Sequence, residues 1–264
     1  MSHASEAWDT LAAVRQHSPL VHSITNYVSM DVTANGLLAA GASPAMVHAM
    51  EEVEDFVAIA SALVVNIGTL SPAWVDAMER AADRARELGK PWVLDPVGAG
   101  ATPYRTRVAR GLARRGPTVI RGNASEILAL VEEGRAGKGV DSTHASDEAR
   151  DVAAGLADEL GCVVAVTGAV DYVTDGSSVL AVANGHPMMT RVTALGCTAS
   201  ALVAAFAAVH PDPLRATAHA LGILGLCGEI AARESPGPGT LRWRLMDALY
   251  TLDEPAVLEG VRIS

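Results

Sequence analysis

Residues 191–206 join a short polar lead-in to an alanine-rich helix at Gly196-Cys197. Glycine adopts backbone angles closed to other residues and lets a ligand approach the main chain. The free N–H groups and the dipole of the helix's first turn attract an anion, commonly phosphate, and favour the thiolate form of Cys197. The stretch therefore predicts phosphate binding beside a reactive side chain. A glycine turn before a buried helix, with Cys197 as a small hydrophobic residue, explains the local sequence at least as well.

Two carboxylates stand where apolar runs end, Asp95 and Glu126, and the first is followed by a loop containing Gly98 and Gly100. Carboxylates beside phosphate oxygens are how proteins hold Mg²⁺, so the pair predicts a metal site. Each has an alternative: Asp95 starts an Asp-Pro turn, and Glu126 completes a capping box that begins at Asn123. The glycines complete neither a dinucleotide-binding fingerprint nor a P-loop.

Apolar runs and helical patterns alternate along the chain. We expect strands at 20–24, 44–47, 62–67, 92–94, 118–120 and 162–167, and a hairpin at 172–183 that turns at Asp175-Gly176. We expect helices at 6–17, 29–40, 51–61, 71–89, 104–114, from 123 on, 146–160, from 197 on, 212–232 and 241–252, a break at 236–239, and a surface loop at 134–143.

This alternation predicts an α/β fold, a single domain over 1–264 with a mostly parallel sheet covered by helices on both faces. Ligands bind past the carboxyl ends of the strands in such sheets. Five polar motifs follow predicted strands: Thr25-Asn26, Asn66-Ile-Gly-Thr, Asp95-Pro-Val-Gly-Ala-Gly, Gly122-Asn-Ala-Ser-Glu and Thr167-Gly168. We therefore expect one site at this edge of the sheet.

The composition excludes several other classes of protein. Half of the 264 residues are hydrophobic and 19% are charged, which indicates a globular chain. A net charge of −10 with 4% aromatic residues argues against a nucleic-acid surface. Local dipoles and a metal ion still allow a small anionic ligand such as a nucleotide.

The cysteines and apolar runs indicate where the protein acts. Cys162, Cys197 and Cys227 lack metal-ligand spacing and imply no disulfide framework, which fits a reducing compartment. Cys162 and Cys227 stand in apolar runs, so we expect core thiols. The first residues lack the pattern of a signal peptide, and the longest apolar run, 199–209, is too short to span a bilayer. We expect a cytoplasmic protein with no membrane partner.

The motifs taken together resemble those of hydroxyethylthiazole kinases, the thiamine-salvage branch of the ribokinase-like superfamily. The resemblance spans nearly the whole chain and rests on these segments: Val21-His-Ser-Ile-Thr-Asn-Tyr-Val, Ala42-Ser-Pro-Ala-Met, Leu94-Asp-Pro-Val-Gly-Ala-Gly, Ile120-Arg-Gly-Asn-Ala-Ser-Glu-Ile, Val166-Thr-Gly and Gly196-Cys197. It implies a ribokinase-like three-layer sandwich and Mg²⁺- and ATP-dependent phosphorylation of the hydroxyl of 4-methyl-5-(2-hydroxyethyl)thiazole. It also implies a homotrimer with active sites between subunits.

The resemblance assigns roles to residues at the positions of the family's motifs. Those expected at the thiazole are Asn26, Met46, Gly68 and Ala194; those at the nucleotide are Arg121, Thr167 and Gly168; those at the metal and phosphates are Asp95 and Glu126; those at the transferred group are Gly196 and Cys197. The chain departs from the family's usual Gly-Thr-Gly-Cys, because Ala194-Leu195 stands before Gly196-Cys197. We expect the anion site to persist, since Gly196 and the helix start remain.

Phosphoryl transfer mostly requires positioning and stabilisation of charge. We therefore expect Cys197 chiefly to position the acceptor hydroxyl, with action as a base secondary. Alternative functions are another ribokinase-like kinase of the hydroxymethylpyrimidine type, a dehydratase of nicotinamide-nucleotide hydrates, a hydrolase with Cys197 as nucleophile, or a non-catalytic nucleotide-binding sensor. The Cys197 position and the Thr25-Asn26-Tyr27 segment argue against the first two, and no histidine stands in a motif that would pair with a nucleophilic cysteine.

Overall fold

The computed structural model describes residues 2–131 and 145–264, and its centre is an eight-stranded sheet with strand order β2-β1-β3-β4-β5-β6-β7-β8. All neighbouring strands from β2 to β6 are parallel, whereas β7 and β8 are antiparallel. The strands are β1 Leu20–Ile24, β2 Ser43–Ala45, β3 Ala62–Asn66, β4 Trp92–Asp95, β5 Val119–Asn123, β6 Val163–Thr167, β7 Asp171–Thr174 and β8 Val179–Val182.

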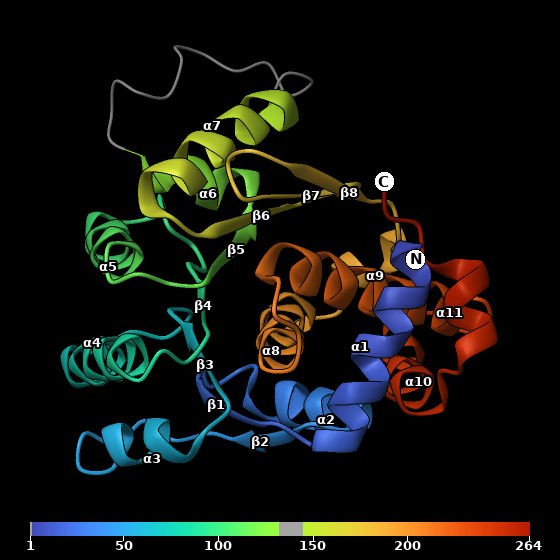
Figure 1. The fold of residues 1–264 in the computed structure, drawn as a ribbon, viewed down its shortest axis with the longest axis horizontal. Coiled ribbons are helices and arrows are strands. Elements are labelled where there is room, and N and C mark those ends of the chain that lie inside the picture. Colours follow the sequence, from blue (N-terminus) through green and yellow to red (C-terminus); the bar gives the residue numbers. More distant parts are fainter. Residues whose placement is uncertain (1, 132–144) are drawn as a thin grey trace.

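Helices cover both faces of this sheet, which confirms the predicted three-layer α/β architecture (Figure 1). One layer contains α3 Val53–Ile59, α4 Pro72–Glu87, α5 Pro103–Ala113, α6 Ala124–Leu130 and α7 Ala145–Leu160. The other contains α1 His3–His17, α2 Met30–Ala40, α8 Leu195–Ala207, α9 Pro213–Ala232, α10 Pro238–Thr251 and α11 Glu254–Gly260, and the short 3₁₀ helix η1 Pro187–Arg191 leads into α8.

The central strands form because their side chains are apolar on both faces. In β3 every residue is buried, and alternate side chains enter different cores: Ala62 and Val64 pack under the α8 layer, whereas Leu63 and Val65 pack under the α4 layer. Side chains alternate across a strand, so a strand between two helical layers reads as a continuous apolar run.

Helix α8 is buried along nearly its whole length. All its residues from Thr198 to Phe206 are buried, and it packs against α9, α2 and strands β3 and β4. Its small side chains allow this close approach from all sides. The helix therefore holds its first turn, with Gly196 and Cys197, directly beside the ends of the central strands.

The structure differs from the sequence-based expectations mainly at element ends. The strand expected at 44–47 is Ser43–Ala45, the helix expected at 51–61 is shortened to Val53–Ile59, and the last predicted helix begins earlier, at Pro238. Proline at the first turn of a helix is well tolerated, so the Pro-Gly-Pro-Gly stretch starts α10 as well as ending α9. Helices α11 and η1 were not predicted. The predicted loop at 134–143 lies outside the described residues.

Candidate active site

The carboxyl ends of the parallel strands, together with the first turn of α8, line two adjoining cavities. The polar cavity, of about 460 Å³, is lined by Asn26, Val28, Gly68, Asp95, Val97, Arg121, Asn123, Glu126, Thr167, Thr193, Ala194, Gly196 and Cys197. The apolar cavity, of about 560 Å³, lies between β6, η1, α8 and α9, and Arg121, Thr167 and Gly196 line both. The five predicted motifs thus meet at one edge of the sheet.

A chain of hydrogen bonds fixes the floor of the polar cavity. The Asn26 amide donates to Asn66 Oδ1 at 2.9 Å, and the Asn66 amide donates to Asp95 Oδ2 at 2.7 Å. Ser200, one turn beyond Cys197 on α8, donates to the same Asp95 oxygen at 2.9 Å. The groups come from the loop after β1, from β3 and β4, and from α8, so several segments together determine the orientation of the Asp95 carboxylate.

Asp95 is fully buried, and its pKa is raised to about 6. Burial is the main cause, because it disfavours the charged form; the Arg121 guanidinium and the bonds from Ser200 and Asn66 act in the opposite direction. Among the described residues, none donates a hydrogen bond to Asp95 Oδ1. One oxygen of a buried carboxylate therefore remains available to a ligand.

The Cys197 thiol lies beside Asp95 and is not activated as a thiolate. Its sulfur accepts from the amides of Asn26 and Asn66 at 3.3 and 3.2 Å. Burial nevertheless raises the pKa of Cys197, and the neighbouring Asp95 charge raises it further. The expectation that the helix dipole favours a thiolate is therefore wrong: at neutral pH this residue is a thiol.

The two glycines of the site allow close approach rather than unusual backbone angles. A Cβ on Gly196 would lie 2.9 Å from Arg121 Nη1, and a Cβ on Gly68 would lie 2.6 Å from Asn26 Nδ2. Gly196 is in the first turn of α8, where its backbone is helical. The residue in the left-handed region is Ala194, at φ 69° and ψ −1°, which forms the N-cap of α8. The interpretation of Gly196 as the special backbone position is therefore wrong; Ala194 has that position despite its Cβ.

Arg121 projects from β5 between the two cavities. Its Nε is buried and has no hydrogen-bond partner within residues 2–131 and 145–264. An arginine presents a planar fork of donors suited to phosphate oxygens. A guanidinium in this position, next to the first turn of α8, can bind an anion that extends from one cavity into the other.

Both explanations of Glu126 describe part of its environment. Asn123 Oδ1 accepts from Glu126 N at 3.0 Å and Glu126 Oε2 accepts from Asn123 N at 2.9 Å, so the capping box is present. Glu126 Oε1 also accepts from Gly98 N at 2.9 Å, and the carboxylate lines the polar cavity with Asp95. A carboxylate oxygen has two lone pairs, so each Glu126 oxygen can accept a backbone N–H and still contact a cation.

The apolar cavity has backbone and apolar walls. Gly168, at the end of β6, donates its N–H to Asp171 Oδ1 at 2.8 Å, and Leu195, Leu221 and Leu224 supply the apolar surface. Thr167 Oγ1 donates to the Gly122 carbonyl at 3.3 Å and so joins β6 to β5. A flat heterocycle and a ribose match such a wall better than a phosphate does.

Met46 is the one predicted site residue that lines neither cavity of the single chain. It follows β2 directly, at the same sheet edge as Asn26.

Two residues of the hydrogen-bond chain on the cavity floor were not assigned a role from the sequence. Asn66 gave a signal, since it is polar at the end of an apolar run, whereas Ser200 is hidden in an alanine-rich helix.

No helix in the described part of the chain is long and apolar enough to cross a membrane.

Comparison with known proteins identifies the family to which this arrangement belongs. The model of the hydroxyethylthiazole kinase family matches residues 11–255. A hydroxyethylthiazole kinase of Syntrophus aciditrophicus is 54% identical over 97% of this chain and 96% of its own.

Solved structures agree with the sequence comparison. The hydroxyethylthiazole kinase of Pyrococcus horikoshii has a TM-score of 0.91 at 46% identity, covering 98% of both chains. A ribokinase-like superfamily protein of Enterococcus faecalis, with a TM-score of 0.63 at 13% identity over 87% of this chain and 86% of its own, shares the fold. The predicted ribokinase-like fold and the predicted family are confirmed, and the chain belongs to the hydroxyethylthiazole kinase family.

Proposed function

We propose that the chain transfers the γ-phosphate of ATP to the hydroxyl of 4-methyl-5-(2-hydroxyethyl)thiazole, with the transferred group above the first turn of α8. As a member of its family the chain is a phosphotransferase of thiamine biosynthesis or salvage. One observation supports the location: the N–H groups near Gly196 and Cys197, the Arg121 guanidinium and the buried Asp95 carboxylate converge on one cavity.

The adenosine part of ATP would occupy the apolar cavity and the phosphates would extend past Arg121 into the polar one. Arg121, Thr167 and Gly196 line both cavities, which supports this orientation. Thr167 and Gly168 would contact the nucleotide. Asn26, Gly68 and Ala194, on the other side of Cys197, would contact the thiazole alcohol.

The donor set fits Mg²⁺. This ion binds proteins through one or two carboxylates together with phosphates and water, and Asp95 and Glu126 provide such a pair. When bound, Mg²⁺ would neutralise charge on the phosphate oxygens. Asp95 Oδ1 and the two Glu126 oxygens, each through its remaining lone pair, would hold the ion.

The residues of the chain would position rather than activate the acceptor. The hydroxyl oxygen forms a bond to the γ-phosphorus while the bond to the bridging β–γ oxygen breaks, and ADP leaves with that electron pair. In a loose transition state the hydroxyl proton leaves late, and an oxygen of the transferred phosphoryl group accepts it. A neutral Cys197 thiol supports this assignment, because a thiol that keeps its proton cannot take another.

The test is ATP turnover with Mg²⁺ against hydroxyethylthiazole, hydroxymethylpyrimidine, pyridoxal and no acceptor. Turnover that requires the thiazole alcohol supports the proposal. Turnover with a different alcohol retains the kinase chemistry but moves specificity to the Ala194-Leu195 departure. ATP binding without turnover on any acceptor contradicts the proposal and favours a nucleotide sensor.

A set of Cys197 variants tests the role of the thiol. We expect Cys197→Ser to keep kcat within about tenfold and Cys197→Ala chiefly to raise KM for the acceptor, because positioning needs a polar atom rather than a base. Steady-state kinetics on both substrates measure this. Loss of activity in Cys197→Ser with recovery only in Cys197→Asp would show that the residue acts as a base.

We also propose that residues 1–264 form a single kinase domain that functions in the cytoplasm as a homotrimer with active sites between subunits. Tyr27 and Val28, next to Asn26, are 66% and 65% exposed, and Met46 lines no cavity of the single chain. A neighbouring subunit at this edge would cover the first two and complete the acceptor site. Light scattering coupled to size-exclusion chromatography should give the mass of three chains.

A further inference from the structure

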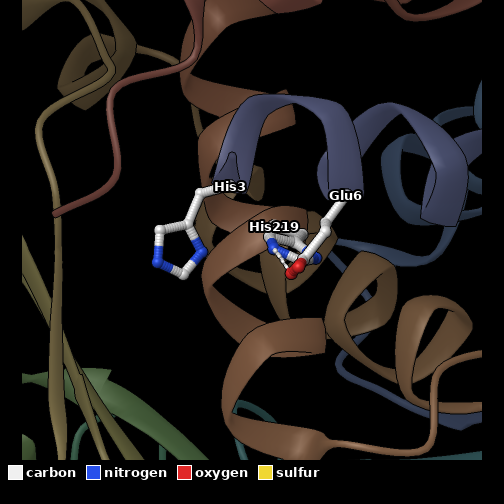
Figure 2. Close-up of side chains that lie close together, drawn as sticks. All are labelled: His3, Glu6 and His219. Carbon is white, nitrogen blue, oxygen red and sulfur yellow. Dashed lines mark ion pairs between the residues drawn. The ribbon is translucent and has the colours of Figure 1, made fainter. Parts of the chain in front are cut away.

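A cluster of potential metal ligands lies away from both cavities, where α1 crosses α9. His3 and Glu6 come from the first turns of α1, and His219 comes from α9 (Figure 2). One ligand atom from each of the three residues lies within 4.8 Å of the other two. Neither the kinase chemistry nor the acceptor site uses any of these residues.

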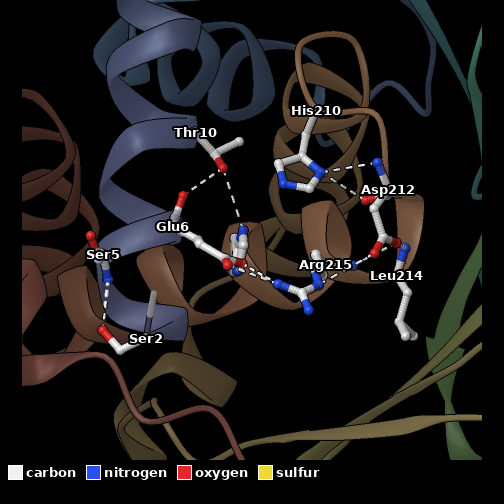
Figure 3. A network of polar contacts seen from close by, with 9 residues as sticks. Ser2, Ser5, Glu6, Thr10, His210, Asp212, Leu214 and Arg215 are labelled. Carbon is white, nitrogen blue, oxygen red and sulfur yellow. Dashed lines mark hydrogen bonds and ion pairs between the residues drawn. The ribbon is translucent and has the colours of Figure 1, made fainter.

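The hydrogen bonds around His219 determine which of its nitrogens has a free lone pair. Thr10 Oγ1 donates to the Glu6 carbonyl at 2.7 Å (Figure 3). The same oxygen lies 3.4 Å from His219 Nδ1. Because the Thr10 proton is directed to Glu6, its oxygen accepts from His219 Nδ1–H. In neutral His219 the lone pair is therefore on Nε2.

That lone pair lacks a partner in a buried position. His219 is 0% exposed, and its Nε2 has no hydrogen-bond partner among the described residues and lies 3.8 Å from Glu6 Oε2. His3 Nδ1 is also buried without a partner. A lone pair directed at a carboxylate is stabilised when a cation lies between them.

The charges packed around the cluster are compatible with such a cation. Arg215 donates to both Glu6 oxygens at 2.8 and 2.6 Å, and its Nε also lies 3.4 Å from Asp212 Oδ2. Two carboxylates thus share one guanidinium, and Glu6 retains lone pairs for a second cation. His210 is not a ligand in this arrangement, because its Nδ1 accepts from Asp212 N at 3.1 Å.

We propose that His3 Nδ1, Glu6 Oε2 and His219 Nε2 bind a divalent transition-metal ion of the Zn²⁺ or Co²⁺ type and so fasten α1 to α9. Two imidazoles and one carboxylate, with water as the fourth ligand, form a donor set that binds Zn²⁺ in preference to Mg²⁺. Tetrahedral coordination brings ligand atoms to about 3.4 Å from one another. The three ligand atoms, which lie within 4.8 Å of one another, would approach to that separation when the ion binds.

The test uses the full chain without a polyhistidine tag, stripped with a chelator and then titrated with Co²⁺. We expect one ion per chain with the visible absorption of four-coordinate Co²⁺, displaced by Zn²⁺, and a higher Tm with Zn²⁺ than without. His3→Ala should weaken binding at least tenfold and abolish the Tm shift. His219→Gln provides a second variant, and His17→Ala, at the exposed end of the same helix, should bind like the unmodified chain.

Two results would overturn the proposal. One is equal Co²⁺ affinity and an equal Zn²⁺ effect on Tm in the unmodified chain, His3→Ala and His219→Gln. The other is a spectrum with sulfur-to-cobalt charge transfer that disappears in Cys197→Ser, since the ion would then be bound in the kinase site. Because the readouts are affinity, spectrum and Tm, they do not depend on whether the chain phosphorylates a thiazole.

Discussion

The two cavities that meet at Arg121 are built in different ways. In the polar cavity, side chains from strand ends are bonded to one another, so Asn26, Asn66 and Asp95 form one connected unit. In the apolar cavity, the walls are backbone and the faces of α8 and α9, and the contact is mostly with carbon. A substitution in the first cavity should therefore disturb the chemistry, whereas one in the second should weaken the binding of one substrate and leave the chemistry unchanged.

Asp95→Asn should give the largest effect and should change activity and stability in opposite directions. Loss of the charge should lower kcat by about 10²-fold or more. Because the native state holds a proton more tightly than the unfolded chain, ionisation of Asp95 costs stability as pH rises from about 4 to about 6. The variant lacks this cost and should be more stable by up to about 3 kcal/mol at pH 7.

Urea unfolding at pH 4 and pH 7, alongside steady-state kinetics, checks both parts. Asp175→Asn, at the exposed hairpin turn, is the control and should leave kcat unchanged. If Asp95→Asn is less stable than the unmodified chain at pH 7, the interactions of the Asp95 carboxylate with Arg121, Ser200 and Asn66 outweigh the cost of its burial.

Arg121→Gln should affect both cavities, because the guanidinium lies between them. We expect KM for ATP and for the acceptor to rise and kcat to fall, with kcat/KM lower by roughly 10- to 100-fold. Kinetics with each substrate varied in turn measure the effect, and Arg107→Gln on the exposed face of α5 is the control. An effect confined to one substrate would mean that the two cavities do not share an anion.

Leu224→Ala tests the apolar cavity, and because Leu224 also packs in the buried core it should lower the free energy of unfolding by roughly 2–5 kcal/mol. Removing part of the cavity's apolar wall should raise KM for ATP about 3- to 10-fold with kcat and the acceptor KM unchanged, since about 25 cal/mol is lost per Å² of apolar contact. Initial rates at varied ATP measure this. A fall in kcat comparable to that of Asp95→Asn would contradict the distinction between the cavities.

Ala194→Gly should give the smallest effect, a gain in stability. An L-residue in the left-handed region costs roughly 1–2 kcal/mol, and glycine removes that cost while adding entropy to the unfolded chain, so the net gain is about 1 kcal/mol. Ser18, the other non-glycine described residue with positive φ, offers a matched control: Ser18→Gly should stabilise similarly without altering kinetics. A changed acceptor KM only in Ala194→Gly would show that this position also determines specificity.

Most of the fold, and the part of the site at the strand ends, could be predicted from the sequence because both depend on local patterns. Apolar runs and N-cap residues such as Ser71 and Asp212 are local signals, and parallel topology then brings strand ends together whatever the helices do. The other cavity depends on how α8 and α9 pack, which no local pattern specifies. Ser200 was missed for the same reason, because its contact with Asp95 spans two elements distant in sequence.

The protonation of Cys197 was predicted wrongly because the field of one helix was considered without the cost of burial. Helix termini favour a thiolate only where water or a cation can also solvate it. Here the sulfur is largely enclosed and stands beside the Asp95 carboxylate.

The state of that sulfur has a consequence for the protein under oxidative stress. Peroxides attack the thiolate, and sulfenic acid formation follows thiolate character and exposure. A half-buried, protonated Cys197 that accepts hydrogen bonds from two amide groups reacts slowly with such oxidants, and the fully buried Cys227 more slowly still. The first turn of α8 can thus contain a cysteine and remain usable when the cell's redox balance shifts.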